Sequence, residues 1–203
     1  MTYSRETTRL RLLEAAVTQV ATEGMRGLTH RKVEARAEVS QGLAKYHFGS
    51  LDGLIEQLLR HMMASQFDLI IVQPPHLGLL RNDPAAIAAL HNDVRAALAR
   101  SLADKEMTRA RFELYLHSSD KPHLQQIIAT ARHEFVERVA AVLQVPEPLI
   151  AARMLLAMVD GILLDQLSSP DQEFQDAASG YLLALAAAST TMPLSVPAAT
   201  EDD

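Results

Sequence analysis

A group of side chains that can bind nucleic acid lies between Thr29 and His47. Thr29 is a residue type that caps helices, because its hydroxyl accepts a hydrogen bond from a backbone N–H that the helix leaves unpaired. His30, Arg31 and Lys32 follow directly. The helix dipole disfavours positive charge at this end of a helix, so another interaction must explain these residues. The phosphate backbone of a nucleic acid would supply it.

Four side chains in this region match particular edges of DNA bases. Arg31 can donate two hydrogen bonds to guanine, and Gln41 can pair in the same way with adenine. Leu43 can contact a thymine methyl group, and Lys45 can reach guanine or phosphate. Taken alone, the cations could equally form a solvated basic turn, so the spacing around them has to decide between the two interpretations.

Two short helices joined by a tight turn are predicted to position these residues. The first begins after Thr29 and the second after Ser40, another capping residue. Ala44 and Phe48 are four residues apart, so they can face inward together and leave the polar side chains outside. This arrangement is typical of a helix-turn-helix, whose second helix enters the major groove of DNA.

The spacing resembles the DNA-binding domain of the tetracycline-repressor (TetR-type) family of bacterial regulators. The resemblance covers roughly residues 1–60 and rests on three runs: Gly27-Leu28-Thr29-x-Arg31-Lys32, Ala37-x-Val39-Ser40-Gln41-Gly42 and Tyr46-His47-Phe48-Gly49-Ser50. It implies a two-fold dimer, an all-helical ligand domain, and release of DNA when a ligand binds. It also implies that Tyr46 and His47 hold the DNA backbone.

Gly42 is expected inside the second helix, where the resemblance favours close approach of the backbone to DNA over a tolerated surface glycine. The predicted DNA contacts are therefore Thr29, His30, Arg31, Gln41, Gly42, Leu43, Lys45, Tyr46 and His47. Two positions depart from the family pattern. Glu38 stands where glycine is usual, and a left-handed backbone there would cost about 1 kcal/mol. Leu51 stands where a lysine often touches phosphate, so that contact is not transferred.

Composition is that of an ordinary globular protein, with 48% hydrophobic and 22% charged residues. Aromatic residues make up only 4%, so the core must be mostly aliphatic, which suits helices. The absence of cysteine excludes a disulfide framework and a thiolate metal site. No apolar run is long enough for a membrane span and none reads as a signal peptide. These features predict a cytoplasmic protein that does not associate with membranes.

Net charge divides unevenly along the chain. The whole chain carries −6, but residues 1–61 hold nine Lys/Arg against seven Asp/Glu, a net +2, and residues 62–203 hold ten against eighteen, a net −8. The asymmetry indicates an N-terminal part that faces DNA and an acidic remainder that does not.

Helical periodicity continues through the rest of the chain. Helices are expected at about 8–22, 50–72, 84–102, 105–117, 122–143, 148–168 and 172–189, with a flexible arm at 1–6 and a loop at 73–83. The predicted fold is all-α. A three-helix helix-turn-helix DNA-binding domain occupies residues 1–50, a helical ligand-binding and dimerisation domain residues 51–190, and a disordered tail residues 191–203.

The segment from Met154 to Leu164 is apolar on nearly every side of its predicted helix. A helix of this kind must be buried all round, and one small domain would struggle to cover it. We therefore expect a homodimer through the last two helices, with Leu163 in the interface.

Four polar residues stand among apolar neighbours in the second domain: His91, Arg111, Tyr115 and His117. Together they predict a largely hydrophobic pocket for a small-molecule effector of unknown identity, although each alone could be solvated or satisfied by a neighbour. The histidines lie on separate segments without metal-ligand spacing. Asp160 and Asp165 are poorly spaced for shared acid–base chemistry, and phosphate-loop and nucleophile motifs are absent. We expect no metal, no cofactor and no enzymatic activity.

Three functions remain open at this point. The first is a ligand-responsive repressor that binds double-stranded DNA as a homodimer. The second is a helix-turn-helix regulator that is controlled by a protein partner without a small ligand. The third is a helical enzyme or structural module whose N-terminus only resembles a DNA reader. Selection of a DNA site separates the third from the others, and release by ligand separates the first from the second.

Overall fold

A computed structural model describes residues 5–70, 84–141 and 147–188, and these ranges consist of helices and short turns without a strand. The helices are α1 (Arg5–Gly27), α2 (His30–Arg36), α3 (Leu43–Phe48), α4 (Leu51–Ile70), α5 (Pro84–Ala103), α6 (Lys105–His117), α7 (Pro122–Ala140), α8 (Pro148–Ser168) and α9 (Gln172–Ala188). The all-α prediction is confirmed. The predicted loop at 73–83 and the tail at 191–203 lie outside the described residues.

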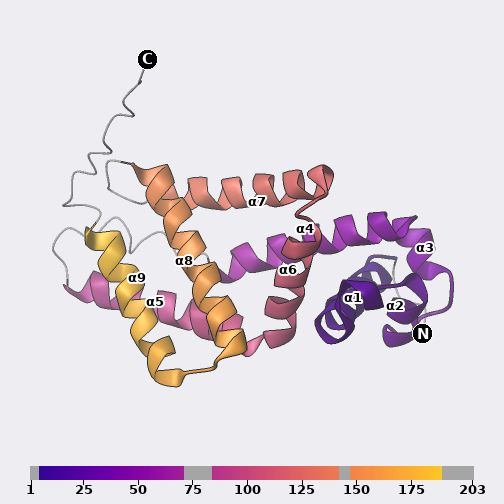
Figure 1. Cartoon of the computed structure of the whole chain (residues 1–203), viewed down its shortest axis with the longest axis horizontal. Helices are drawn as coiled ribbons and strands as arrows, with labels where there is room; N and C mark the ends of the chain where they lie inside the picture. Colours follow the sequence, from indigo (N-terminus) through magenta and orange to yellow (C-terminus); the bar gives the residue numbers. More distant parts are fainter. Residues whose placement is uncertain (1–4, 71–83, 142–146, 189–203) are drawn as a thin grey trace, which may run out of the picture.

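The first three helices form one end of the molecule, and α4 runs from them into the remaining helices (Figure 1). α1 packs against both α2 and α4, while α3 packs between α2 and α4. Gly53 in the first turn of α4 permits a close crossing with α3, because a Cβ there would lie 2.2 Å from the carbonyl oxygen of Phe48. The hydroxyl of Ser50 accepts from the Gly53 N–H at 3.1 Å and so caps α4.

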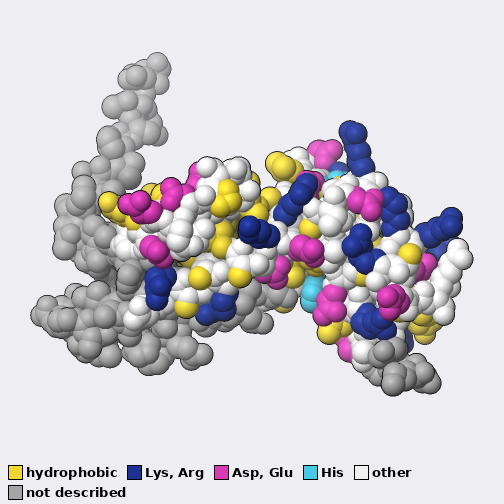
Figure 2. Space-filling view, turned by 90° about the horizontal axis from the view of Figure 1, so that it is seen from below, with side chains coloured by type: hydrophobic (Ala, Val, Ile, Leu, Met, Phe, Trp, Pro, Cys, Tyr) yellow, Lys and Arg dark blue, Asp and Glu magenta, His cyan; other side chains and the backbone are white. Residues whose placement is uncertain are grey.

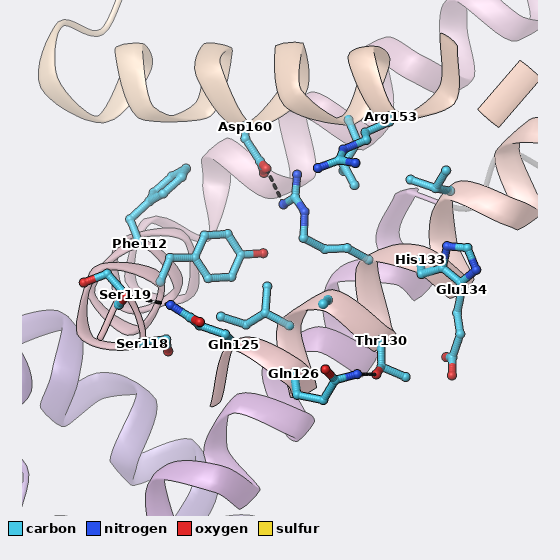
Figure 3. A pocket seen from close by; sticks show the side chains of 16 residues that line it. Phe112, Ser118, Ser119, Gln125, Gln126, Thr130, His133, Glu134, Arg153 and Asp160 are labelled. Atoms are coloured by element: carbon cyan, nitrogen blue, oxygen red, sulfur yellow. Dashed lines mark hydrogen bonds and ion pairs between the residues drawn. The ribbon is translucent and has the colours of Figure 1, made fainter. Parts of the chain in front are cut away.

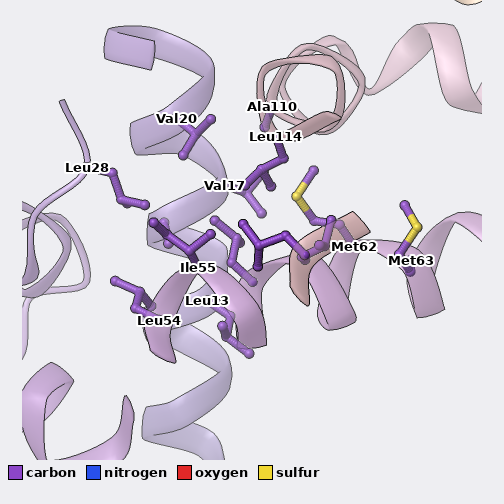
Figure 4. Packing of buried hydrophobic residues seen from close by; sticks show 14 of the residues in the cluster. Leu13, Val17, Val20, Leu28, Leu54, Ile55, Met62, Met63, Ala110 and Leu114 are labelled. Carbon is purple, nitrogen blue, oxygen red and sulfur yellow. The ribbon is translucent and has the colours of Figure 1, made fainter. Parts of the chain in front are cut away.

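A continuous aliphatic core joins this end to the second group of helices. Leu13 and Val17 of α1 meet Leu54 and Ile55 of α4, and Leu114 of α6 packs onto them (Figure 4). α6 therefore lies along α1 as well as α4. A hydrogen bond of 2.8 Å from the Thr18 hydroxyl to Glu106 reinforces this contact. Movement of α6 would thus reach the helix-turn-helix through two helices and not through α4 alone.

Most predicted boundaries agree with the structure, and the first helix is the main exception. α1 begins at Arg5, so residues 5 and 6 belong to a helix and not to a flexible arm. Gly24 has a left-handed φ of 67°, which kinks the chain, but helical structure resumes as far as Gly27. The predicted end of this helix, at about residue 22, therefore falls short of the observed end.

Within a single chain α8 is not buried all round, and the burial of its remaining face by a partner chain stays a prediction. Leu163 is fully buried and packs with Leu98 of α5, but Met154 is 60% exposed and Leu164 is 52% exposed. Ile150 is also exposed, at 53%. One face of α8 is covered by neighbouring helices and another face is open.

Among the described residues, no helix is both long and apolar enough to cross a membrane.

Candidate nucleic-acid interface

The N-terminus of α2 has the capped geometry that its sequence predicts. The Thr29 hydroxyl accepts a hydrogen bond from the Lys32 N–H at 3.3 Å. Arg31 is exposed on the first turn. Lys32 pairs with Glu23 of α1 at 2.5 Å, so its charge is already partly balanced. His30 is half-buried, and its Nε2 is buried without a partner within the described structure, so this edge of the ring faces inward.

The turn between α2 and α3 contains two left-handed residues. Glu38 has a φ of 52°, which confirms the strained non-glycine position anticipated from the sequence. Gly42 has a φ of 95° and stands at the N-cap of α3. The prediction that Gly42 lies inside a helix is wrong, because α3 begins only at Leu43 and both Gln41 and Gly42 belong to the turn.

The side chain of Glu34, and not that of Ser40, caps α3. Glu34 is only 4% exposed, and its Oε1 accepts from the backbone N–H of Gly42 at 3.0 Å and of Ala44 at 2.8 Å. A carboxylate at this position satisfies unpaired N–H groups and complements the helix dipole. Glu34 thereby fixes α3 relative to α2. The sequence carried no local signal for it, because its bonds span eight and ten residues.

The outward face of α3 carries the remaining predicted contacts. Lys45 is exposed, and Tyr46 is 65% exposed with the guanidinium of Arg5 lying 5.5 Å from its ring centre. The ring of His47 stands edge-on to that of Tyr46, with centroids 5.2 Å apart. Arg5 thus adds a cation to this face, which the sequence analysis missed because it placed this residue in a flexible arm.

Burial, followed by the nearby charges of Arg5 and Arg9, lowers the pKa of His47. His47 is therefore mostly neutral at neutral pH, and it can donate a hydrogen bond without carrying a charge. A phosphate group placed beside it would favour its protonated form.

The predicted contacts come together as one surface made of the start of α2, the turn, and the outer face of α3. Figure 2 shows Lys and Arg side chains gathered over this end of the molecule, with acidic side chains between them. Cationic and hydrogen-bonding groups on a short helix held by a helix-turn-helix are suited to contacts with phosphates and base edges in a major groove.

A second feature is a cavity of about 1070 Å³ between α6, α7 and α8. Among the residues predicted for a ligand site, Tyr115 lines this cavity, whereas Arg111 and His117 do not. Arg111 is buried beside the cavity wall. His117 borders a different hollow between α1 and α6. The side chain of His91 lies outside the described part of the chain.

Two residues that the sequence analysis did not assign to the pocket supply its strongest polar contact. Arg132 of α7 donates from Nη1 to Oδ2 of Asp160 of α8 at 2.6 Å, and both line the cavity (Figure 3). Asp160 was considered only as a structural carboxylate. The pairing joins different helices, so spacing along the sequence gave no indication of it.

This helix-turn-helix, followed by a helical domain with an open pocket between its helices, defines a DNA-binding transcriptional regulator. Comparison with known proteins agrees. The family described as "Bacterial regulatory proteins, tetR family" matches residues 12–58, and "Tetracyclin repressor-like, C-terminal domain" matches residues 82–188. The chain belongs to the tetracycline repressor family, whose members are transcriptional regulators and not enzymes.

Several relatives extend over most of the chain. The HTH-type transcriptional regulator BetI of Paraburkholderia xenovorans (strain LB400) is 27% identical over 79% of this chain and 82% of its own length. A TetR family member from Streptomyces coelicolor A3 is 31% identical, with a TM-score of 0.68 over 88% of this chain and 97% of that one. The multidrug binding protein EbrR, solved with ethidium, is 31% identical, with a TM-score of 0.64 over the same shares, 88% and 97%.

Proposed function

We propose that this chain is a cytoplasmic repressor that binds a palindromic operator as a homodimer and leaves it when a small, mostly apolar effector binds. The cavity is the observation that carries this proposal. Its walls combine apolar side chains from α6, α7 and α8 with a larger number of polar and charged ones, so they offer a small molecule both hydrophobic surface and hydrogen-bonding groups. EbrR, which was solved with ethidium, offers a precedent in a similar protein for an aromatic ligand.

Coupling from the cavity to DNA would run through α6. Tyr115 lines the cavity, and its hydroxyl contacts the sulfur of Met63 on α4 at 3.8 Å. The same helix packs along α1. An effector that displaces α6 would therefore shift both helices that hold the helix-turn-helix. Such an effector must bind the DNA-incompetent state more tightly, because equal affinity for both states shifts nothing.

Dimerisation is supported by the open face of α8. Ile150, Met154, Ala157, Gly161 and Leu164 are all exposed and repeat at helical spacing, so they form one stripe. Ala157 and Gly161 at its centre would let a partner helix approach closely, and open space surrounds the Cβ position of Gly161.

Exposed Phe174 and Tyr181 on the neighbouring α9 are seven residues apart and extend this surface. A two-fold dimer through α8 and α9 would place two α3 helices on successive turns of the major groove, about 34–36 Å apart. The proposed organisation keeps the DNA-binding unit at 1–50 and the ligand and dimer unit at 51–190.

Selection from random double-stranded DNA tests the first half of the proposal. We expect a two-fold symmetric site, with half-sites one helical turn apart. Recovery of no symmetric site would contradict the operator model. A reporter gene behind the selected site then tests repression, which should be relieved by compounds that release DNA in a gel shift. A protein that binds the site but responds to no compound would favour control by a protein partner.

A further inference from the structure

Three charged side chains from three helices meet beside the cavity: Arg111 of α6, Arg132 of α7 and Asp160 of α8. Arg132 and Asp160 form an ion pair at 2.6 Å. Arg111 is 4% exposed, and its Nε and Nη2 are buried without a hydrogen-bond partner within the described structure. Oδ1 of Asp160 is likewise buried and unpartnered. Two guanidinium groups thus share one carboxylate, and the cluster carries a surplus positive charge.

This surplus charge is energetically unfavourable. A buried ion needs an opposite charge and hydrogen bonds to offset its lost hydration. Burial lowers the pKa of Arg111, with Tyr115 and Asp160 acting in the opposite direction, but a guanidinium stays protonated in proteins. Burial also raises the pKa of Tyr115, so its phenol stays neutral and does not supply the missing anion.

Charges at the cavity mouth do not remove the surplus either. Glu134 and Arg153 line the cavity with opposite signs and are both exposed. His133 faces Glu137 at 3.3 Å. The buried cluster is therefore the part of the cavity that lacks one negative charge.

Apolar side chains also line the cavity, among serine, glutamine and threonine side chains. Phe112, Ile128, Val136 and Leu156 line it together with the aromatic face of Tyr115. In Figure 3, the side chains of Phe112 and Asp160 border the same space and come from different helices. A ligand in this space would find hydrophobic surface for an apolar body and the guanidinium of Arg132 for an anionic end.

We propose that the effector is an organic anion, namely a carboxylate with an apolar body, whose carboxylate binds Arg132 and frees Asp160 to neutralise Arg111. The ligand carboxylate would then neutralise Arg132, and Asp160 would neutralise Arg111. This inference rests on the proposed ligand response and gives its ligand a charge. The negative charge of the proposed ligand is opposite to the charge of ethidium, the cation with which EbrR was solved.

The test uses a panel of apolar bodies (naphthyl, biphenyl and decyl), each prepared as carboxylate, neutral amide and ammonium. Calorimetry and thermal shift measure binding to the full-length protein. The best carboxylate should bind about tenfold or more tightly than its own amide, as expected for charge-assisted hydrogen bonds. No carboxylate exceeding its amide, or tighter binding of the ammonium form, overturns the proposal. Inorganic phosphate alone stabilising the protein as much as the carboxylate would overturn the role of the apolar body.

Two substitutions should change the preference of the protein for carboxylate over amide ligands in opposite directions. Arg111→Met balances the cluster, so the advantage of carboxylate over amide should fall to about twofold or less, while the melting temperature without ligand stays the same or rises. Asp160→Asn increases the surplus and should strengthen carboxylate binding. Arg111→Lys keeps the charge and should keep the preference. Arg109→Met, exposed on the same helix, is the matched control and should change nothing. An unchanged preference in Arg111→Met, or a weaker one in Asp160→Asn, contradicts the charge argument.

DNA release is measured separately with the selected operator. A carboxylate that binds with the predicted preference yet leaves DNA affinity unchanged supports the anion site and contradicts the ligand-responsive repressor. Release by neutral or cationic compounds alone supports the repressor and contradicts the anion site.

Discussion

The carboxylate of Glu34 on α2 accepts a hydrogen bond of 2.8 Å from the backbone N–H of Ala44 in the first turn of α3. The same oxygen also accepts from Gly42 at 3.0 Å. The two helices of the helix-turn-helix are thus locked together by a buried side chain rather than by apolar packing alone. These bonds tie the start of α3 to α2.

Glu34→Ala should lower the free energy of unfolding by about 1–3 kcal/mol, because two N–H groups lose their acceptor. Urea denaturation measures this loss. Glu34→Gln keeps an acceptor oxygen and should recover most of the stability. Glu38→Ala, an exposed neighbour in the turn, is the control. Equal stability of Glu34→Ala and wild type would show that the cap is dispensable.

Arg31→Ala should weaken binding to a site that carries guanine at the contacted position by about 1–3 kcal/mol and relax the preference for that base. His47→Ala should weaken all sequences to the same degree, because a backbone contact carries no sequence information. Competition binding against operators with single base changes measures both effects. If Arg31→Ala lowers affinity uniformly, Arg31 contacts phosphate and not a base.

Met154→Arg should give folded monomers with weak DNA binding, because it places a charge within the proposed dimer surface. Sedimentation velocity and circular dichroism check association and folding. Leu163→Arg, which the sequence suggested for the same purpose, should instead lower the melting temperature, because Leu163 is fully buried within one chain. A dimeric Met154→Arg would place the interface elsewhere.

Stability should fall as the pH decreases below about 6.5. Burial is the main cause that lowers the pKa of His61 and also of His117 from the ordinary value of 6.5. The unfolded chain therefore takes up protons at a higher pH than the folded chain does, and acid favours unfolding. Urea unfolding at pH 7.5 and pH 5.5 measures the difference, which His61→Gln should reduce. Greater stability at the lower pH would contradict this sign.

The sequence by itself determined the elements whose signals are local. Thr29 caps α2 by accepting a hydrogen bond from the N–H of Lys32, three residues further along the chain. Pro122 and Pro148 begin α7 and α8, and α6 spans its expected residues 105–117. Helical periodicity and capping act within one or two turns, so they can be recognised in a short window. The helix-turn-helix and its basic residues were identified for the same reason.

Only the tertiary structure decided which side chains complete the sites. α3 begins at Leu43 instead of after Ser40 because Glu34, from another helix, binds the N–H groups at its start. Arg132 and Asp160 are 28 residues apart and meet because α7 packs on α8. α8 is apolar on nearly every side, but its neighbours cover Leu163 and leave Met154 open. Burial, hydrogen-bond partners and net charge at these positions depend on contacts between helices, which no local pattern encodes.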